Sequence, residues 1–424
     1  MQKMKYSGVE WIGEIPKDWE ILPTKRFFSH TKTLAGDKVD TYERLALTMN
    51  GVIKRSKDDS EGLQPEKFDT YQVLKENELV FKLIDLANVK TSRVGLSPFT
   101  GIVSPAYIVL TNESDDNRFY YYFFISMYYN EIFNRLGDNG VRSSLNAQDL
   151  LSVPIVNISS DTQHRIADFL DDKCGKIDRY IEKLQQIIDK LKEYKQAVIT
   201  EAVTKGLDPD VPMKDSGIEW IGMIPEHWDV PEIKYLVRIA SGGTPDRNHP
   251  EYWNGNIPWI KTGELQNDII TNAEEYITEE GLNNSSAQVF NINTILVAMY
   301  GQGKTRGMTA LLKTPASTNQ ACAGLTVTNS NVQIEYLWQC LIGAYDAIRS
   351  EAAGSGQPNL SATLIGNFHI ALPPIEEQGL IVEYIKDRTV EIKSTIHKAE
   401  KLLEKLTEYK KSLIYEAVTG KLEV

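Results

Sequence analysis

The sequence predicts an α+β fold with two mixed α/β modules, two long helices and an internal repeat, and three observations support this prediction. Residues 6–19 of the 424-residue chain return as residues 215–228, and residues 194–204 return as residues 409–419. The stretches between these shared ends show little likeness to each other. Similar frames around dissimilar middles indicate a common scaffold that carries two differently specialised modules.

The repeated opening of each half reads Ser-Gly-Val/Ile-Glu-Trp-Ile-Gly-x-Ile-Pro-x-x-Trp. Its tryptophans are Trp11 and Trp19 in the first copy, and Trp220 and Trp228 in the second. Large aromatic side chains contribute most when they are buried, so we expect these residues to anchor the frame rather than to bind a ligand.

The dissimilar middles are expected to mix strands and helices. Residues 77–81 and 293–299 are short apolar runs next to polar turns, which indicates strands. Residues 119–133 and 333–348 contain aromatic residues, with alanines in the second segment, and we expect helices there.

A long helix is expected at the end of each half. The first begins near residues 161–163, with no proline until Pro209, and the second begins after Pro373 and Pro374. In both, apolar residues recur at three- and four-residue spacings, which is a heptad seam. The seam residues are Ile181, Leu184, Ile188, Leu191, Val198 and Ala202 in the first helix, and Ile396, Ala399, Leu403, Leu406, Leu413 and Ala417 in the second.

These seams leave the partner of each helix open. An ordinary buried helix pair and a coiled coil with another chain are alternatives, but two matching seams in one chain favour pairing with each other. Antiparallel pairing would place the modules at opposite ends, related by an approximate two-fold axis. Lys195 and Lys410 interrupt the seams at the same place, where a polar residue fixes register at some cost in stability. Gly206 and Gly420 are expected to end the helices.

The composition bears on partners and on compartment. Lys and Arg number 46 against 58 Asp and Glu, and the net charge of −12 does not favour tight DNA binding by the chain alone. Binding depends, however, on where the positive groups lie. No stretch approaches the roughly 18 apolar residues of a membrane span, and no apolar run of a signal peptide follows residues 1–5. The three cysteines are far apart, so we expect no disulfide framework or zinc site, and a cytoplasmic protein.

One motif suggests nucleotide chemistry. Residues 298–305 fit a loose phosphate-loop pattern after an expected strand. A true phosphate loop opens into a helix whose N-terminus holds the phosphates, whereas residues 306–312 read as a turn into another strand. The sequence shows no methyltransferase motif, paired metal ligands or nuclease carboxylate–lysine cluster. The chain is therefore expected to be non-catalytic.

The repeated opening resembles that of the specificity subunits of type I restriction-modification systems. Residues 241–245 (Ser-Gly-Gly-Thr-Pro), 251–253 (Glu-Tyr-Trp), 257–265 (Ile-Pro-Trp-Ile-Lys-Thr-Gly-Glu-Leu) and 373–378 (Pro-Pro-Ile-Glu-Glu-Gln) resemble them too, in the expected order. The resemblance implies two target-recognition domains separated by two long antiparallel helices. Each domain would read one half of a bipartite target in double-stranded DNA, and the helices would set the spacing and dock two methyltransferase subunits. Restriction or translocase subunits would add to that complex.

The resemblance also divides the chain into segments. These are the N-terminal repeated segment (1–20), the first recognition domain (21–155), the first long helix (156–206), a linker with the second repeated segment (207–229), the second recognition domain (230–374) and the second long helix (375–424). The first domain lacks the Gly-Gly-Thr-Pro opening, but residues 50–55 and 81–86 resemble a second subtype of recognition domain.

Positive residues in turns are the candidates for DNA contact. Residues 299–313 carry three cations and no acidic residue, and Arg, Lys and Gln pair with base edges in the major groove. The alternative for such a loop is a solvated hairpin. The predicted DNA-binding residues are Lys54, Arg55, Lys82, Lys90, Ser92 and Arg93 in the first domain, and Tyr300, Gln302, Lys304, Thr305 and Arg306 in the second. The turns at 140–144 and 354–359 are weaker candidates.

The sequence therefore predicts a DNA-specificity subunit, with a protein-binding coiled-coil adaptor as the alternative and a phosphate-loop enzyme behind both. No catalytic residue, metal site or cofactor is expected in this chain. The resemblance places S-adenosylmethionine, and ATP with Mg where a nuclease is present, on the partner subunits.

Overall fold

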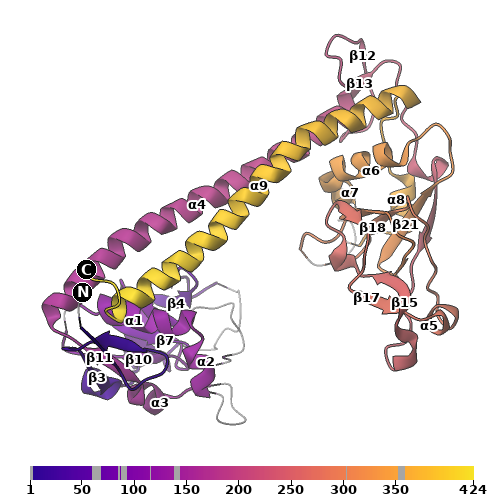
Figure 1. The fold of residues 1–424 in the computed structure, drawn as a ribbon. Helices are drawn as coiled ribbons and strands as arrows, with labels where there is room; N and C mark the ends of the chain where they lie inside the picture. The colour runs from indigo at the N-terminus through magenta and orange to yellow at the C-terminus, as the bar shows by residue number, and fades with distance from the viewer. Residues whose placement is uncertain are drawn as a thin grey trace. The chain divides into compact units, whose positions relative to one another are not determined.

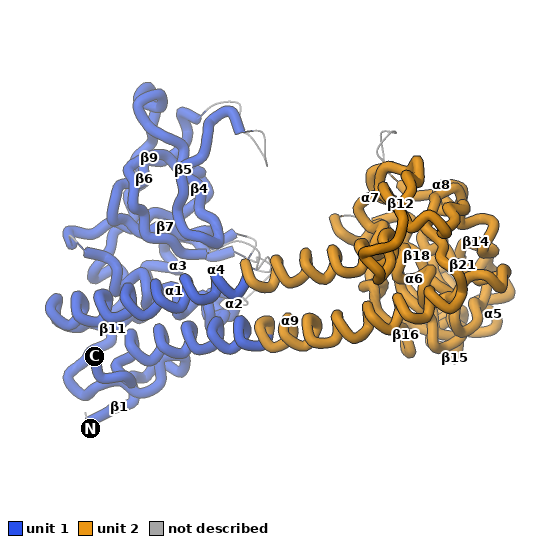
Figure 2. The backbone as a smooth tube through the Cα atoms, turned by 90° about the horizontal axis from the view of Figure 1, so that it is seen from above, with its two compact units in different colours: residues 1–185, 401–424 blue, residues 186–400 orange. Residues whose placement is uncertain are grey.

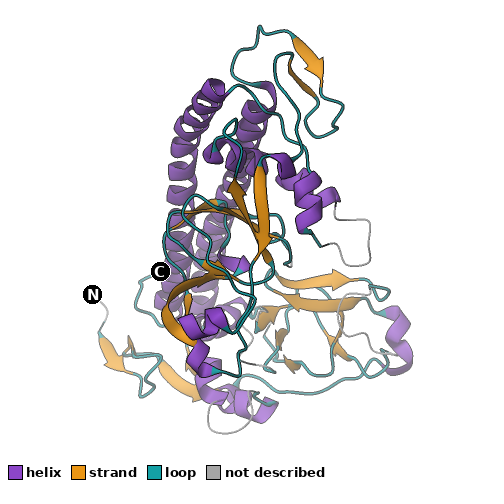
Figure 3. Cartoon of the chain, turned by 90° about the vertical axis from the view of Figure 1, so that its right-hand side faces the viewer, coloured by secondary structure: helices purple, strands orange, loops and turns teal. Residues whose placement is uncertain are grey.

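The computed structural model describes residues 3–59, 68–84, 86, 93–114, 116–137, 144–301, 303–351 and 359–424. They fold into two compact units, blue and orange in Figure 2. Unit 1 comprises Met1–Gln185 and Lys401–Val424, and unit 2 comprises Gln186–Glu400. Both units mix strands and helices (Figure 3), which confirms the predicted mixed α/β character.

Unit 1 is built from small sheets packed on an aromatic helix. One sheet has the strand order β5-β4-β9-β6 (Gly51–Arg55, Arg44–Thr48, Gly101–Val103, Gln72–Leu74), and another β10-β7-β8 (Ile108–Leu110, Leu79–Phe81, Val94–Leu96). Its shorter helices are α1 (Arg118–Tyr129), α2 (Ile132–Gly137) and α3 (Ala147–Ser152). Helix α1 supplies much of the core: Phe124 meets Phe81 edge to face, with ring centroids 5.0 Å apart, and Tyr120 meets Phe28 at 5.1 Å.

Unit 2 contains a larger sheet. The five-stranded sheet has the order β14-β21-β18-β19-β16 (Val237–Ser241, Cys322–Val327, Ile295–Ala298, Thr309–Leu312, Asp268–Ile270), and a smaller sheet the order β17-β15-β20 (Glu275–Ile277, Trp253–Ile260, Ser317–Thr318). The shorter helices are α5 (Glu279–Asn283), α6 (Ile334–Gly343), α7 (Tyr345–Glu351) and α8 (Ala362–Asn367). Helix α6 packs on the large sheet, where the indole N–H of Trp338 donates to Thr309 Oγ1 at 2.8 Å.

The repeated openings form matching hairpins. β1 (Met4–Tyr6) pairs with β2 (Glu14–Pro16) in the register Met4–Pro16, and β12 (Met213–Asp215) pairs with β13 (Met223–Pro225) in the register Met213–Pro225. Both partners are displaced by the same number of positions, since 213 − 4 and 225 − 16 are each 209. The sequence repeat is thus also a repeat of strand register.

A second shared feature joins the two ends of each middle segment. β3 (Glu20–Pro23) pairs antiparallel with β11 (Pro154–Asn157), and in unit 2 the bridges Asp229–Leu372 and Glu232–His369 occupy the corresponding place. In each unit, the segment between the shared ends therefore starts and finishes at backbone positions that pair with each other.

The two long helices, α4 (Ser160–Lys205) and α9 (Ile375–Val418), begin where the sequence predicts them (Figure 1). The predicted seam residues are all buried or half-buried. In unit 1 the early part of α4 meets the late part of α9, and Lys410 Nζ lies 2.6 Å from Asp178 Oδ1. In unit 2 the late part of α4 meets the early part of α9, with Lys192 Nζ 3.0 Å from Glu400 Oε1.

The glycines predicted to end the helices lie against the repeated tryptophans. Gly206 has φ of 75° and Gly420 has φ of 69°, in the left-handed region that favours glycine at a helix C-terminus. A Cβ on Gly206 would lie 3.0 Å from the ring of Trp228, and one on Gly420 would lie 2.9 Å from the ring of Trp19. Of the four tryptophans predicted to anchor the frame by burial, Trp19 and Trp228 are buried, and Trp11 and Trp220 are half-buried.

Candidate nucleic-acid interface

The basic loop of unit 2 is a hairpin loop. It connects β18 to β19, and these strands pair antiparallel, with Val297 opposite Thr309. The chain thus passes from strand to strand, as predicted, and no helix N-terminus follows the loop to hold a phosphate. The phosphate-loop alternative is therefore wrong.

The predicted contact residues of this loop differ in exposure. Lys304 and Tyr300 are exposed, whereas Thr305 and Arg306 are half-buried. Gln302 lies outside the described residues. The loop rests on α7, where Arg349 Nη1 donates to the carbonyl of Arg306 at 2.6 Å. The structure therefore places a Lys and a Tyr on the outside of a supported loop.

In unit 1, Lys54 and Arg55 end strand β5 and line a shallow hollow that also includes Arg44 and Lys57. Both carry acidic partners, because Lys54 Nζ lies 2.6 Å from Glu43 and Arg55 Nε lies 2.6 Å from Asp59. The hollow gathers four cations, and a phosphate would have to compete with the carboxylates for them. The hollow thus brings the predicted contacts Lys54 and Arg55 together with two cations that were not predicted, Arg44 and Lys57.

Two further candidates of unit 1, Lys82 and Arg93, lie within the described residues, and the guanidinium of Arg93 is buried. Only 1% of Arg93 is exposed, and its Nη atoms donate to the carbonyls of Ile84 at 3.3 Å and Leu86 at 3.1 Å. This arrangement turns Arg93 inward, so that it supports the neighbouring backbone instead of facing a ligand. Lys82 is half-buried, and its backbone N–H donates to the backbone carbonyl of Arg93.

Several candidates lie outside the described residues. They are Lys90 and Ser92 in the first domain, and residues 140–143 and 354–358 of the two weaker turns.

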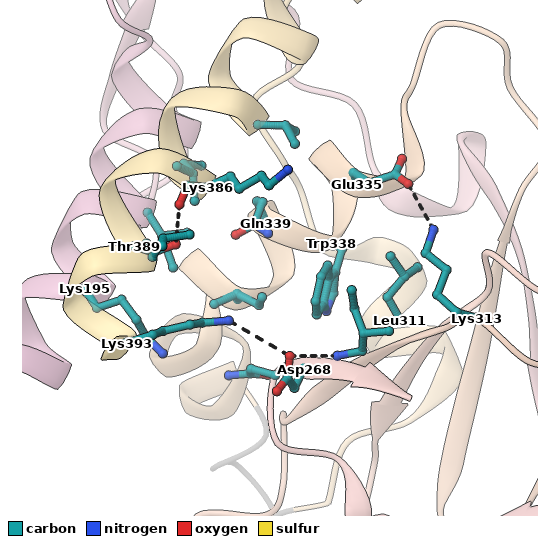
Figure 4. Close-up of a pocket in the computed structure, with 17 residues that line it drawn as sticks. Lys195, Asp268, Leu311, Lys313, Glu335, Trp338, Gln339, Lys386, Thr389 and Lys393 are labelled. Atoms are coloured by element: carbon teal, nitrogen blue, oxygen red, sulfur yellow. Dashed lines mark hydrogen bonds and ion pairs between the residues drawn. The ribbon is translucent and has the colours of Figure 1, made fainter. Parts of the chain in front are cut away.

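Sequence reasoning missed a cavity of about 350 Å³ in unit 2 (Figure 4). Its wall comes from α4, α6, α9 and two strands of the large sheet, and apolar residues such as Ile199 and Trp338 form much of it. Lys195, Lys386 and Lys393 also line it. Burial lowers the pKa of Lys195, and the neighbouring Lys393 ammonium lowers it further. No short sequence motif could reveal this cavity, because its residues come from five separate segments.

Two further searches bear on other classes of site. Among the residues that the structure describes, no group of three or more His, Cys, Asp or Glu is arranged to hold a metal ion. No helix within those residues is long and apolar enough to cross a membrane. Cys174, Cys322 and Cys340 are buried and free, and burial raises the pKa of the Cys322 thiol to about 12.

The chain is similar in sequence to known restriction proteins. A family model described as the type I restriction modification DNA specificity domain matches residues 225–405. The type I restriction enzyme MjaIX specificity subunit of Methanocaldococcus jannaschii is 32% identical over 195 residues, which are 44% of this chain and 43% of that protein. The EcoR124I/EcoR124II specificity subunit of Escherichia coli is 30% identical over 183 residues, or 41% of this chain and 45% of that protein. The chain thus spans a little under half the length of these two relatives.

The fold is also that of a solved structure. The chain in a study described as the structural basis underlying complex assembly and conformational transition of the type I R-M system has a TM-score of 0.67. It is 13% identical, and the match covers 96% of this chain and 99% of that one. The family match includes the whole basic hairpin loop, so sequence and fold agree on unit 2. Residues 225–405 thus match the type I restriction modification DNA specificity domain, and the chain as a whole shares its fold with a chain of a type I R-M system.

Proposed function

We propose that this chain is the non-catalytic subunit that gives a cytoplasmic type I restriction-modification complex its DNA sequence specificity. Each recognition domain reads one half of a bipartite target. The observation that carries this proposal is the basic hairpin loop with exposed Lys304, which lies inside the segment matched by the specificity-domain family. Cations on a supported loop can pair with base edges in the major groove.

We also propose that α4 and α9 form an antiparallel coiled coil with pseudo-two-fold symmetry, which sets the distance between the half-sites. The ion pairs Asp178–Lys410 in unit 1 and Lys192–Glu400 in unit 2 support this pairing. The equal register of the two hairpins supports the symmetry.

Docking of two methyltransferase subunits is supported by two exposed stripes with the same chemistry. One consists of Ile187, Lys190 and Tyr194 on α4, and the other of Leu402, Lys405 and Tyr409 on α9. Each has positions i, i+3 and i+7, which share one helix face. The differences 402 − 187, 405 − 190 and 409 − 194 are all 215. Ile187 and Leu402 are 48% and 46% exposed, and Tyr194 and Tyr409 are 55% and 56% exposed.

The duplication of these outward stripes indicates two copies of one partner. Each stripe offers an aliphatic group, an ammonium and a phenol, so the partner surface should be apolar with an acidic group opposite the lysine. Restriction or translocase subunits would join through the methyltransferases.

The second candidate function is a protein-binding adaptor, which the stripes and the net charge of −12 favour. Sequence-selective retention of DNA by the assembled complex separates the two functions. Mapping methylated motifs in cells with and without this chain identifies the target for such an assay.

The test of the proposed function is the Lys304→Ala/Arg306→Ala variant, assembled with the methyltransferase subunits. Loss of one bidentate base contact costs about 1–3 kcal/mol, so cognate binding should weaken roughly 5- to 150-fold. The loss should be confined to the half-site that unit 2 reads. The measurement is binding and methylation of targets altered in one half-site at a time.

The matched control for this test is Lys234→Ala/Lys205→Ala. It also removes two positive charges from unit 2, but these lysines pair with Glu232 and Glu201. The control should bind cognate DNA like the wild type. Equal binding by the loop variant and the control would show that the loop does not read DNA.

A further inference from the structure

Two side chains of helix α7 form hydrogen bonds to the backbone of the basic loop of unit 2, and together these bonds are called the grip below. Arg349 Nη1 donates to the carbonyl of Arg306 at 2.6 Å, and Arg349 Nη2 donates to the carbonyl of Gly303 at 2.9 Å. The hydroxyl of Tyr345 donates to the carbonyl of Lys304 at 2.6 Å and accepts from Arg349 Nη1 at 3.0 Å. One guanidinium and one phenol thus hold three carbonyls within four consecutive residues.

The loop backbone is shaped to allow this grip. Gly303 has φ of 59° and Gly307 has φ of 84°, both in the left-handed region, so the chain turns sharply on each side of Lys304–Arg306. A Cβ on Gly307 would lie 3.2 Å from Arg349 Cγ, so the side chain of Arg349 lies close against the loop. The guanidinium also lies over the ring of Tyr345, 5.0 Å from its centroid.

This geometry affects the charge that the loop presents. Carbonyl oxygens are the negative ends of the peptide dipoles, and here three of them are occupied by donors from α7. With these three carbonyls bonded to α7, less negative partial charge faces solvent beside the exposed ammonium of Lys304, which suits an anionic ligand. A loop that is already ordered also loses less conformational entropy when it binds.

We propose that Arg349 is a positioning residue that holds the loop in the conformation needed to discriminate between base sequences, without touching DNA itself. This inference rests on the proposed function of the loop. The guanidinium suits the task because its planar fork bonds two carbonyls at once, which an ammonium on a flexible stem cannot match.

The test compares Arg349→Lys with the wild type in the assembled complex. In Arg349→Lys we expect the ratio of the affinity for cognate DNA to the affinity for a single-base variant to fall about ten-fold. The reason is that the loop of this variant must become ordered at the moment of binding. Affinity for non-specific DNA and its dependence on salt should stay unchanged. A lost phosphate contact would instead reduce the slope of log K against log salt by about 0.9. Tyr345→Phe, which removes one donor, should shift the ratio in the same direction by a smaller factor.

The matched control is Arg388→Lys on α9. Arg388 lies over the ring of Tyr384, four residues earlier in a helix, as Arg349 lies over Tyr345. The control should leave the discrimination ratio unchanged, and thermal unfolding should show that all variants fold.

Three results would overturn the inference. An unchanged ratio in both loop-side variants shows that the grip does not matter for discrimination. A reduced salt slope in Arg349→Lys shows that Arg349 contacts phosphate directly. If the wild-type complex does not discriminate between sequences at all, the proposed function fails, and this inference fails with it.

Discussion

Lys195 and Lys410 show how the same residue at the same place in a repeat can acquire different energetics. Lys410 Nζ bonds both carboxylate oxygens of Asp178, at 2.6 and 2.8 Å. Lys195 lines the cavity of unit 2, where burial and the ammonium of Lys393 lower its pKa, against a smaller opposing effect of Asp268. Lys410 therefore has an acidic partner in the folded chain, whereas burial and a neighbouring like charge destabilise the charged form of Lys195.

Replacing Lys195 by Met should therefore raise the free energy of unfolding near neutral pH, by about 0.5–1 kcal/mol. Because its pKa is lower in the folded chain, the unfolded chain binds this proton more tightly. The free-energy cost of keeping Lys195 charged in the folded chain is full below its folded pKa and falls as the pH rises toward 10.5. The stability advantage of Lys195→Met should therefore shrink with rising pH. The measurement is the midpoint of thermal unfolding against pH.

The control for this prediction is the repeat-related variant Lys410→Met. It removes the bond to the half-exposed Asp178 and should lower stability by no more than about 1 kcal/mol. A shift of the same sign in both variants would contradict the different roles assigned to the two lysines.

At this scale the sequence located the charged residues of the loop, but not their surroundings in the fold. The cations at 304 and 306 could be found because they are neighbours in the chain. Arg349 was missed because it lies more than 40 positions away, and only the packing of α7 brings it to the loop. Arg93 was proposed as a DNA contact, but a charged residue in a turn has the same sequence pattern whether it faces solvent or, as here, the inside.

At the scale of elements, the helices could be predicted because their signals are local. The heptad seams and the ending glycines located α4 and α9, and the apolar runs located β7 and β18. The order of strands in the sheets could not be predicted, since strands such as β16 and β19 are neighbours only in space. The cavity of unit 2 depends on the same long-range packing.

The paired stripes give a prediction at this scale. Tyr194→Ala and Tyr409→Ala should each reduce the number of methyltransferase subunits bound from two to one, because a central Tyr often carries much of an interface's energy. The double variant should bind none. Native mass spectrometry of the co-expressed complex measures this number.

Tyr180→Ala is the control for the stripes. Tyr180 is 63% exposed on α4, but Thr395 stands at its repeat position on α9, so it belongs to no duplicated stripe. Two bound subunits in both single tyrosine variants of the stripes would rule out these faces as the docking sites.

At the scale of the whole molecule, the long helices should act as the spacer between half-sites. Deleting residues 180–186 and 395–401 removes one heptad from each helix and retains both stripes. Each helix becomes shorter by about 10 Å, which corresponds to roughly three base pairs of DNA. The modules also turn relative to the duplex, so activity should fall before a shorter spacer is accepted.

The assay for the deletion uses one pair of half-sites with graded spacers, after assembly of the complex has been verified. An unchanged optimal spacer would contradict the role of the helices in setting distance. The specificity of each half-site should be preserved, because the basic hairpin loop and its support on α7 lie outside the deleted segments.

If the basic loop reads DNA as we propose, its support on α7 has a consequence for how the target can change. Arg349 and Tyr345 bond carbonyl oxygens at three positions of the loop, and every residue type possesses a carbonyl. These bonds therefore do not depend on which side chains stand at 304, 305 and 306. Substitutions at these three positions can then accumulate one at a time, in evolution or by design, while the loop keeps its conformation. New sequence preferences thus become accessible through point mutations, with no need to rebuild the domain.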